Sequence, residues 1–163
     1  VARMLRQNVN CPTTSSGGRL FDAACGLLNV IPVAKFEGEA PMALERMVRR
    51  VRVHAGGWRL EDGVLDLLPL LDVLSGLDPE DGAEVFHGTL AAAMADWVAE
   101  AAEASGIRRV ALSGGCFLNG VLVKALTEEL GRRDIEPLHA IRLKPGDSAV
   151  SLGQAWAVAM ARG

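Results

Sequence analysis

Three glycine-containing loops stand out as places where this chain could bind a ligand. They are Ser15-Ser16-Gly17-Gly18, Ser113-Gly114-Gly115 and Lys144-Pro145-Gly146-Asp147-Ser148, and each precedes a segment with helical periodicity. Glycine lets the backbone come close to a ligand where a Cβ atom would collide. Free amides at a helix start favour a negative group such as phosphate. The pattern therefore indicates either a phosphate-binding site or plain tight turns, because a Gly-Gly pair between strand and helix is typical of both.

The acidic and sulfur-containing residues near these loops also have two interpretations. Asp147 is a candidate metal ligand or an N-cap, because Asp is among the preferred N-cap residues. Asp22 follows Gly18 by one helical turn, and by spacing alone it is a surface acid in a first turn. Cys116 begins a helix, a position that can acidify a thiol. Without a nearby His or Lys partner we interpret Cys116 as a small buried residue.

The three histidines give no catalytic or metal-binding pattern of their own. His54, His87 and His139 are far apart in the sequence and form no HxxxH or HExxH motif. His87 follows a phenylalanine on an amphipathic segment, which is typical of a packed or capping histidine. The sequence contains no recognisable Ser-His-Asp or Cys-His arrangement.

The second half of the chain alternates between helix and strand around these loops. Apolar periodicity predicts a helix over about 81–105, a strand at 110–112, a helix from 117, a strand at 138–143 and a helix over 148–161. Strands joined in this way run parallel with right-handed crossovers. Ligands of open α/β sheets bind at the carboxyl ends of the strands, where the second and third loops lie. The fold class is therefore α/β.

The first half of the chain is expected to be mainly helical. The pattern predicts helices over about 19–28 and 68–74, and one from Pro41 to about His54 that ends at Gly56-Gly57. Between them, Glu61-Asp62-Gly63 is typical of a hairpin turn.

Composition narrows the class of protein. The chain has 163 residues, of which 50% are hydrophobic and 23% charged, as in a single globular domain with a real core. The net charge of −3 gives no reason to expect nucleic acid, and no apolar run is long enough for a bilayer. Three cysteines without a CxxC pair fit a reducing, cytoplasmic setting. The start at Val1, inside a helical pattern, indicates a piece of a longer polypeptide.

Five short motifs follow one another along nearly the whole chain: TSSGGRLFDA (14–23), FEGEA (36–40), FHGTLA (86–91), LSGGCFLN (112–119) and GDSAVSLGQA (146–155). In this order they resemble the TSSxGRLFDA, (Y/F)EGQA, FHxTLA, LSGGVFQN and NDGGIALGQA motifs of the HypF-type carbamoyltransferases of nickel–iron hydrogenase maturation. Gly17, Glu39, Cys116 and Ser148 are among the positions that depart from the family pattern, and they bear on whether the activity is standard.

The resemblance implies a fold and a nucleotide site. The family's last domain is similar to the Kae/TsaD enzymes of the actin-like ATPase (ASKHA) superfold, and residues 1–163 correspond to its second lobe. Gly114 and Gly115 match glycines that approach the nucleotide phosphates, and Asn119 matches an asparagine at the nucleoside. Gly18 and Asp22 match a GxxxD element whose acid faces the ribose hydroxyls.

The resemblance also implies a metal. Asp147 matches an aspartate that ligates iron or zinc alongside two histidines of an HxxxH element, which this sequence lacks; Mg²⁺ is a further candidate ion. The reaction implied is carbamoyl transfer, in which the lobe holds ATP or carbamoyl-adenylate and the acceptor is the C-terminal cysteine of a HypE-type partner. The remaining domains of the parent chain would supply the other parts, so the isolated lobe is expected to be inactive.

Two other functions stay open from the sequence. One is a tRNA threonylcarbamoyl-type transferase, against which the acidic balance and the 14–23 motif argue. The other is a non-catalytic module for nucleotide binding or partner docking, a role that an isolated lobe could have.

Overall fold

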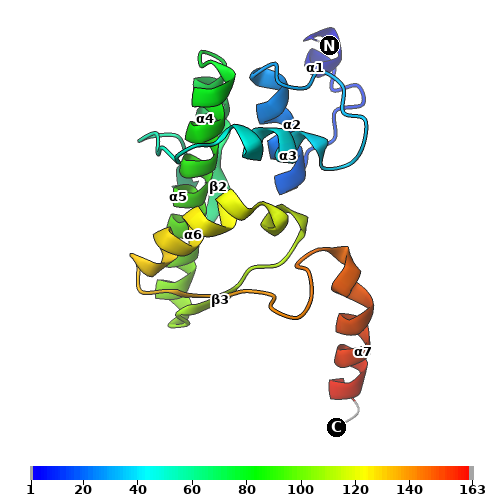
Figure 1. The fold of residues 1–163 in the computed structure, drawn as a ribbon, viewed down its shortest axis with the longest axis vertical. Coiled ribbons are helices and arrows are strands. Elements are labelled where there is room, and N and C mark those ends of the chain that lie inside the picture. Colours follow the sequence, from blue (N-terminus) through cyan, green and yellow to red (C-terminus); the bar gives the residue numbers. More distant parts are fainter. Residues whose placement is uncertain (1, 162–163) are drawn as a thin grey trace.

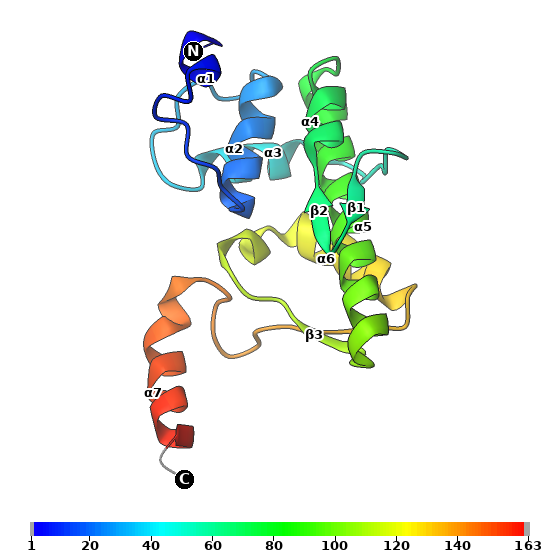
Figure 2. The same ribbon diagram turned by 180° about the vertical axis from the view of Figure 1, so that it is seen from behind.

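The computed structural model describes residues 2–161, which form helices, short 3-10 turns and two small sheets (Figures 1 and 2). In chain order the elements are α1 (Ala2–Arg6), α2 (Gly17–Leu27), α3 (Glu39–Met47), β1 (Arg59–Glu61), β2 (Val64–Asp66), α4 (Leu68–Leu74), α5 (Pro79–Ser105), β3 (Arg109–Ala111), η1 (Gly115–Leu118), α6 (Gly120–Gly131), β4 (Glu136–Leu138), η2 (Asp147–Ala149) and α7 (Val150–Ala161).

Helix α5 is the centre of the hydrophobic core. Asp78 caps its start by accepting the Asp81 N–H at 3.0 Å, and Gly106 ends it with a φ of 73°. Helices α3, α4 and α6 contact α5, and α2 joins this layer through α3 and α4. Because residues 82–93 of α5 are all buried, this segment fixes the positions of the helices around it.

The second half has the predicted strand-helix-strand arrangement. Strands β3 and β4 pair in parallel, with Val110 opposite Pro137, and α6 connects them. This confirms the α/β crossover. The prediction of a strand at 138–143 was wrong in its bounds. Ile135, directly before β4, is buried, so the strand begins earlier, whereas Ile141 is 94% exposed.

The prediction of a helix from Pro41 to His54 was also wrong, because α3 ends at Met47. The segment after it lies extended along α5, where the Arg52 N–H donates to the Glu84 carbonyl at 3.1 Å and the His54 N–H donates to Thr89 Oγ1 at 2.9 Å. A Cβ atom on Gly88 would lie 2.4 Å from the Arg52 carbonyl oxygen. The glycine therefore creates the space for this segment, and the β-branched valines within it favour an extended chain.

The predicted hairpin is confirmed. Strands β1 and β2 pair antiparallel around Asp62 and Gly63, whose φ angles of 51° and 73° are those of a two-residue type I′ turn.

Helix α7 differs from the others because it projects away from the rest of the chain in both views (Figures 1 and 2). All of its residues are exposed. Among residues 2–161, no helix is long and apolar enough to cross a membrane.

Candidate functional site

The three glycine-containing loops meet in space, although they are far apart in the sequence. The Gly114 N–H donates to the Pro145 carbonyl at 2.7 Å, and a Cβ on Gly146 would lie 3.9 Å from the Gly115 Cα. From the other side, a Cβ on Gly17 would lie 3.0 Å from Cys116 Sγ. The start of α2 and the loop before η2 therefore flank the loop that follows β3.

Open space lies beside the two central glycines. Apart from the glycine itself and its two chain neighbours, no atom of the described residues is within 4 Å of the Cβ position of Gly114 or Gly115. Gly114 has a φ of 111°, a conformation that L side chains rarely adopt, whereas Gly115 has no such constraint. A ligand can therefore approach the backbone here, and Gly115 is the residue at which a side chain would test that approach without straining the backbone.

The backbone amides that could meet a phosphate are those of η1, not those of α6. Gly120 and Val121 donate to Glu45 Oε1 at 2.7 and 3.4 Å, and Leu122 donates to Asn119 Oδ1 at 2.9 Å. The free amides expected at the helix start after the glycines are therefore not those of α6. Gly115 and Cys116, in the first turn of η1, have amides with no acceptor among residues 2–161.

The Asn119 side chain is directed into the protein. It is 5% exposed and caps α6, while its Nδ2 lies 3.0 Å from His87 Nε2. An amide has two donor hydrogens and two acceptor lone pairs, so one of each is left. The predicted contact of Asn119 with the nucleoside stays a prediction.

His87 is the fully buried partner of that amide. Its Nδ1 lies 2.8 Å from the Ala83 carbonyl, and the rings of Phe21 and Phe86 pack edge-on against it. Burial lowers the pKa of His87, so the neutral ring is favoured. The interpretation of His87 as a packed histidine is confirmed.

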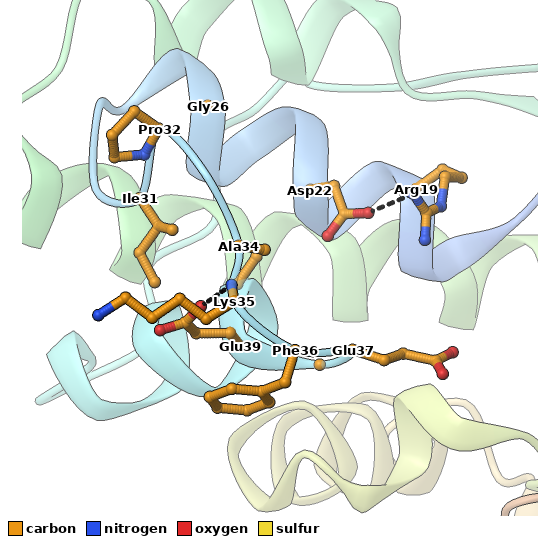
Figure 3. A pocket seen from close by; sticks show the side chains of 12 residues that line it. Arg19, Asp22, Gly26, Ile31, Pro32, Ala34, Lys35, Phe36, Glu37 and Glu39 are labelled. Atoms are coloured by element: carbon orange, nitrogen blue, oxygen red, sulfur yellow. Dashed lines mark hydrogen bonds and ion pairs between the residues drawn. The ribbon is translucent and has the colours of Figure 1, made fainter.

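A pocket of about 580 Å³ lies between α2 and the segment that leads into α3 (Figure 3). Charged side chains line much of it: Arg19, Asp22, Lys35, Glu37 and Glu39. Asp22 pairs with Arg19 at 3.0 Å and is partly exposed. Because α2 begins at Gly17 with Ser16 as its N-cap, Gly18 lies within the helix and Asp22 in its second turn. The prediction of Asp22 as a first-turn acid was therefore wrong. The GxxxD element thus runs along α2 from Gly18, next to the place where the loops meet, to Asp22, which lines this pocket.

Glu39 has a local role at the mouth of the same pocket. Its Oε2 accepts the Lys35 N–H at 2.5 Å and so closes the turn before α3 (Figure 3). The amide oxygen of a glutamine could accept the same bond, so the structure explains why either residue fits at position 39.

Asp147 begins η2, directly after the loop that contacts Gly114. Its side chain is exposed and makes no hydrogen bond or ion pair with the described part of the chain, and the N-cap of η2 is Gly146. The carboxylate is therefore available as one oxygen ligand for a metal. Within residues 2–161 no group of three or more His, Cys, Asp or Glu side chains could hold a metal ion. Further ligands would have to come from outside these residues.

Two departures from the family motifs prove to be neighbours. The missing Cβ at Gly17 leaves room for Cys116 Sγ, which would otherwise be in tight contact with it. Cys116 is partly buried, and burial raises the pKa of its thiol, so the position disfavours thiolate. Nothing in the structure explains the serine at 148.

The sequence did not reveal Glu45 or the pairing of His87 with Asn119. Glu45 lies outside the five motifs and reaches α6 over 75 positions of sequence. His87 and Asn119 each lie in a motif, but only the crossing of α5 and α6 brings them together.

Comparison with known proteins agrees with this geometry. Residues 1–154 match the family model described as the second subdomain of the Kae1-like domain of a carbamoyltransferase, HypF_C_2. The chain is 45% identical to a carbamoyltransferase HypF from Rhizobium leguminosarum bv. viciae, over 93% of this chain and 20% of that protein. It is 39% identical to a HypF homolog from Cupriavidus necator, over 98% and 44% of the two chains.

Solved structures give the same relation. The fold is similar to that of a full-length HypF in a phosphate- and nucleotide-bound form, with a TM-score of 0.81 and 28% identity. A HypF from T. kodakarensis has a TM-score of 0.81 and 30% identity. In both comparisons the match covers 94% of this chain and 21% of the other, so the chain spans about a fifth of these proteins.

Proposed function

Since the chain belongs to the HypF carbamoyltransferases, as the second subdomain of their Kae1-like domain, we propose that it binds ATP or carbamoyl-adenylate and serves carbamoyl transfer to the C-terminal cysteine of a HypE-type partner. The observation that carries this proposal is the meeting of the three glycine-containing loops at one place, beside open space. The nucleotide in a related HypF structure supports the choice of ligand.

Each part of the proposed site has a defined task. The amides of Gly115 and Cys116 donate to the adenylate phosphate. Asp22 accepts from the ribose hydroxyls, on the pocket side of α2. For the Asp22 carboxylate to do so, its ion pair with Arg19 has to be shared or released, which is cheap because both side chains are solvated.

Asp147 would contribute one carboxylate ligand to a metal, iron or zinc, that other parts of the enzyme also hold. A metal bound there supplies Lewis-acid polarisation of the carbamoyl carbonyl. In the transfer step the partner's cysteine thiolate attacks the carbamoyl carbon, a C–S bond forms and the C–O bond to phosphate breaks. AMP leaves with that electron pair, so no cysteine of this chain is needed as nucleophile.

The nucleotide assignment is tested by adding one methyl group. The longer polypeptide that carries this chain, called the parent polypeptide below, is prepared with Gly115→Ala, and ADP binding is measured by calorimetry. We expect affinity to fall about tenfold or more, because the new Cβ occupies the phosphate space. Gly131→Ala is the matched control, because its Cβ also meets no neighbouring atom. Equal affinity in both variants would remove the loop from the nucleotide site.

The metal assignment has a separate test. Asp147→Asn keeps the shape of the side chain but removes its charge. The Asp147 carboxylate makes no hydrogen bond or ion pair with the described residues, so the substitution removes no contact on which folding depends. We expect unchanged thermal stability and reduced iron or zinc content of the parent polypeptide, measured by elemental analysis. Full metal occupancy in a folded Asn variant would exclude Asp147 as a ligand.

The non-catalytic function is distinguished by a transfer assay. Carbamoyl-adenylate and a HypE-type acceptor are given to this chain alone and to the parent polypeptide, and the mass of the acceptor's terminal cysteine is measured. We expect modification only with the parent polypeptide, because one carboxylate does not make a shaped metal site. No modification in either case would favour a binding module.

A further inference from the structure

We propose that His87 and Glu45 are positioning residues for the nucleotide loop: from α5 and α3 they fix the turn that joins η1 to α6 and so set the direction of the Gly115 and Cys116 amides. The inference rests on the proposed function, because it assigns this loop to the phosphate. Neither side chain is placed on the ligand itself.

The hydrogen bonds of His87 define a single tautomer. The Ala83 carbonyl can only accept, so at 2.8 Å it requires the proton on Nδ1. Nε2 is then an acceptor, and it receives the Nδ2–H of Asn119 at 3.0 Å. The other end of this amide is fixed as well, because its Oδ1 accepts the Leu122 N–H at 2.9 Å. The amide thus has one orientation that satisfies both partners.

The surroundings of His87 keep it in this state. The residue is fully buried, and the edges of Phe21 and Phe86 restrict rotation of the ring. A protonated ring would turn an N–H toward the Asn119 N–H and lose the bond. Burial disfavours that charged form, which agrees with the lowered pKa of His87.

Glu45 holds the same turn from the opposite side. A single carboxylate oxygen accepts from both Gly120 and Val121, the first two residues of α6. A carboxylate at this position also faces the positive end of the helix dipole. Together with the Asn119 cap, three successive amides are satisfied before any ligand binds, so the helix start is an anchor and not a binding site.

The anchored turn lies directly beside the loop that would bind phosphate. Asn119 ends η1, and its N–H donates to the Cys116 carbonyl at 3.2 Å. A loss of either anchor frees Asn119 to change conformation, and the preceding residues move with it. A small displacement of donor groups is enough to weaken a site that depends on their direction.

The experiment compares pairs of variants in the parent polypeptide. Glu45→Ala removes both bonds to α6, whereas Glu45→Gln keeps an acceptor oxygen. His87→Leu removes the bond to Asn119, whereas the amide oxygen of His87→Gln can accept it. We expect ADP affinity, by calorimetry, to fall about tenfold in the Ala and Leu variants and to recover in large part in both Gln variants. Glu100→Ala, an exposed acid on α5, is the control and should bind as wild type does.

The outcomes separate this inference from the proposed function. If the wild type binds no ADP, the proposed function fails. If the wild type binds and folded Glu45→Ala binds equally well, the positioning role is wrong. Nitrogen NMR of the His87 ring gives a second test that needs no ligand: we expect protonated Nδ1 and unprotonated Nε2 at neutral pH, and the opposite tautomer would overturn the inference. If His87→Leu does not fold, the Glu45 pair and the ring signals still decide.

Discussion

Two regions of the molecule are built in different ways. In the first, called the body below, α2, α3, α4 and α6 pack around α5. The second is the end that carries β3, β4 and α7. In the body, three buried polar side chains have partners: Glu84 forms an ion pair with Arg52, Thr89 accepts from the His54 N–H, and His87 accepts from Asn119. Among the described residues Arg52 Nε is buried without a hydrogen bond, although it lies 3.1 Å from the Glu84 carboxylate. At the other end, α7 is exposed along its whole length, and the two strands pair only with each other among the described residues. The first region is largely packed within residues 2–161, whereas the second leaves α7 exposed.

The difference shows how the site is held. The Gly114-Gly115 loop, which has open space beside it, belongs to the exposed end, but its fixed points, Glu45 and His87, belong to the body. A rigid scaffold that positions open loops is the usual arrangement of binding sites. The comparison therefore predicts that substitutions in the body change stability, and that those at the two anchors Glu45 and His87 also change binding. Substitutions at the far end should change binding or have little effect.

The largest effect is expected from Gly88→Ala. A methyl group there would lie 2.4 Å from the Arg52 carbonyl oxygen. Either α5 or the 48–54 segment that is hydrogen-bonded to it would have to move. We expect the free energy of unfolding, measured by urea denaturation, to fall by about 3 kcal/mol. Gly131→Ala, with open space around its Cβ, should change it by less than about 1 kcal/mol. Similar values for the two variants would mean that the 48–54 segment does not lie tightly on α5.

The pH dependence of stability is the second prediction, and it comes from His87. Its folded-state pKa is lowered, chiefly by burial, with the Ala83 carbonyl and Glu45 as weaker opposing influences. The unfolded state therefore binds the proton more readily, so stability is fully present above about pH 6.5 and declines as the pH falls below it. In His87→Gln the part of the acid-induced loss of stability that comes from His87 should be absent. Urea denaturation midpoints of the wild type and of His87→Gln, measured at several pH values, test this prediction. If the two midpoints decline in parallel as the pH falls, the prediction is wrong.

Local patterns in the sequence were enough for much of the fold. The long helix at α5, the Asp62-Gly63 hairpin and the parallel crossover each follow from periodicity or turn chemistry. The helix predicted to His54 failed because the backbone N–H groups of Arg50, Arg52 and His54 donate to α5 instead. This close approach depends on Gly88, far along the chain. The glycine loops were visible as motifs, but their meeting point and the Glu45 anchor arise only from tertiary packing.

A smaller effect is expected where the two regions touch, between Gly17 and Cys116. Gly17→Ala gains helix propensity but places a Cβ 3.0 Å from Cys116 Sγ. In a Cys116→Ala background that contact is gone, so the same change should be more favourable, by about 0.5 kcal/mol. A double-mutant cycle by thermal or urea unfolding measures this coupling. A value of zero would show that the thiol moves aside without cost.

The smallest effect is expected in α7, and two tryptophans make the comparison direct. Trp97 on α5 is 44% exposed, yet its indole N–H donates to the Gly63 carbonyl at 2.7 Å and holds the hairpin to the helix. Trp156 on α7 is 66% exposed, and among residues 2–161 the main contacts of its helix are with the adjoining η2. In this chain Trp97→Gln should lower the free energy of unfolding by about 1–2 kcal/mol, through a lost hydrogen bond and lost apolar contact. Trp156→Gln should change the free energy of unfolding by less than about 0.5 kcal/mol, because little packing is removed.

Urea denaturation of the two variants provides the measurement. If Trp156→Gln destabilises this chain as much as Trp97→Gln does, α7 packs on the body in solution, and the division between a packed region and an exposed one is wrong.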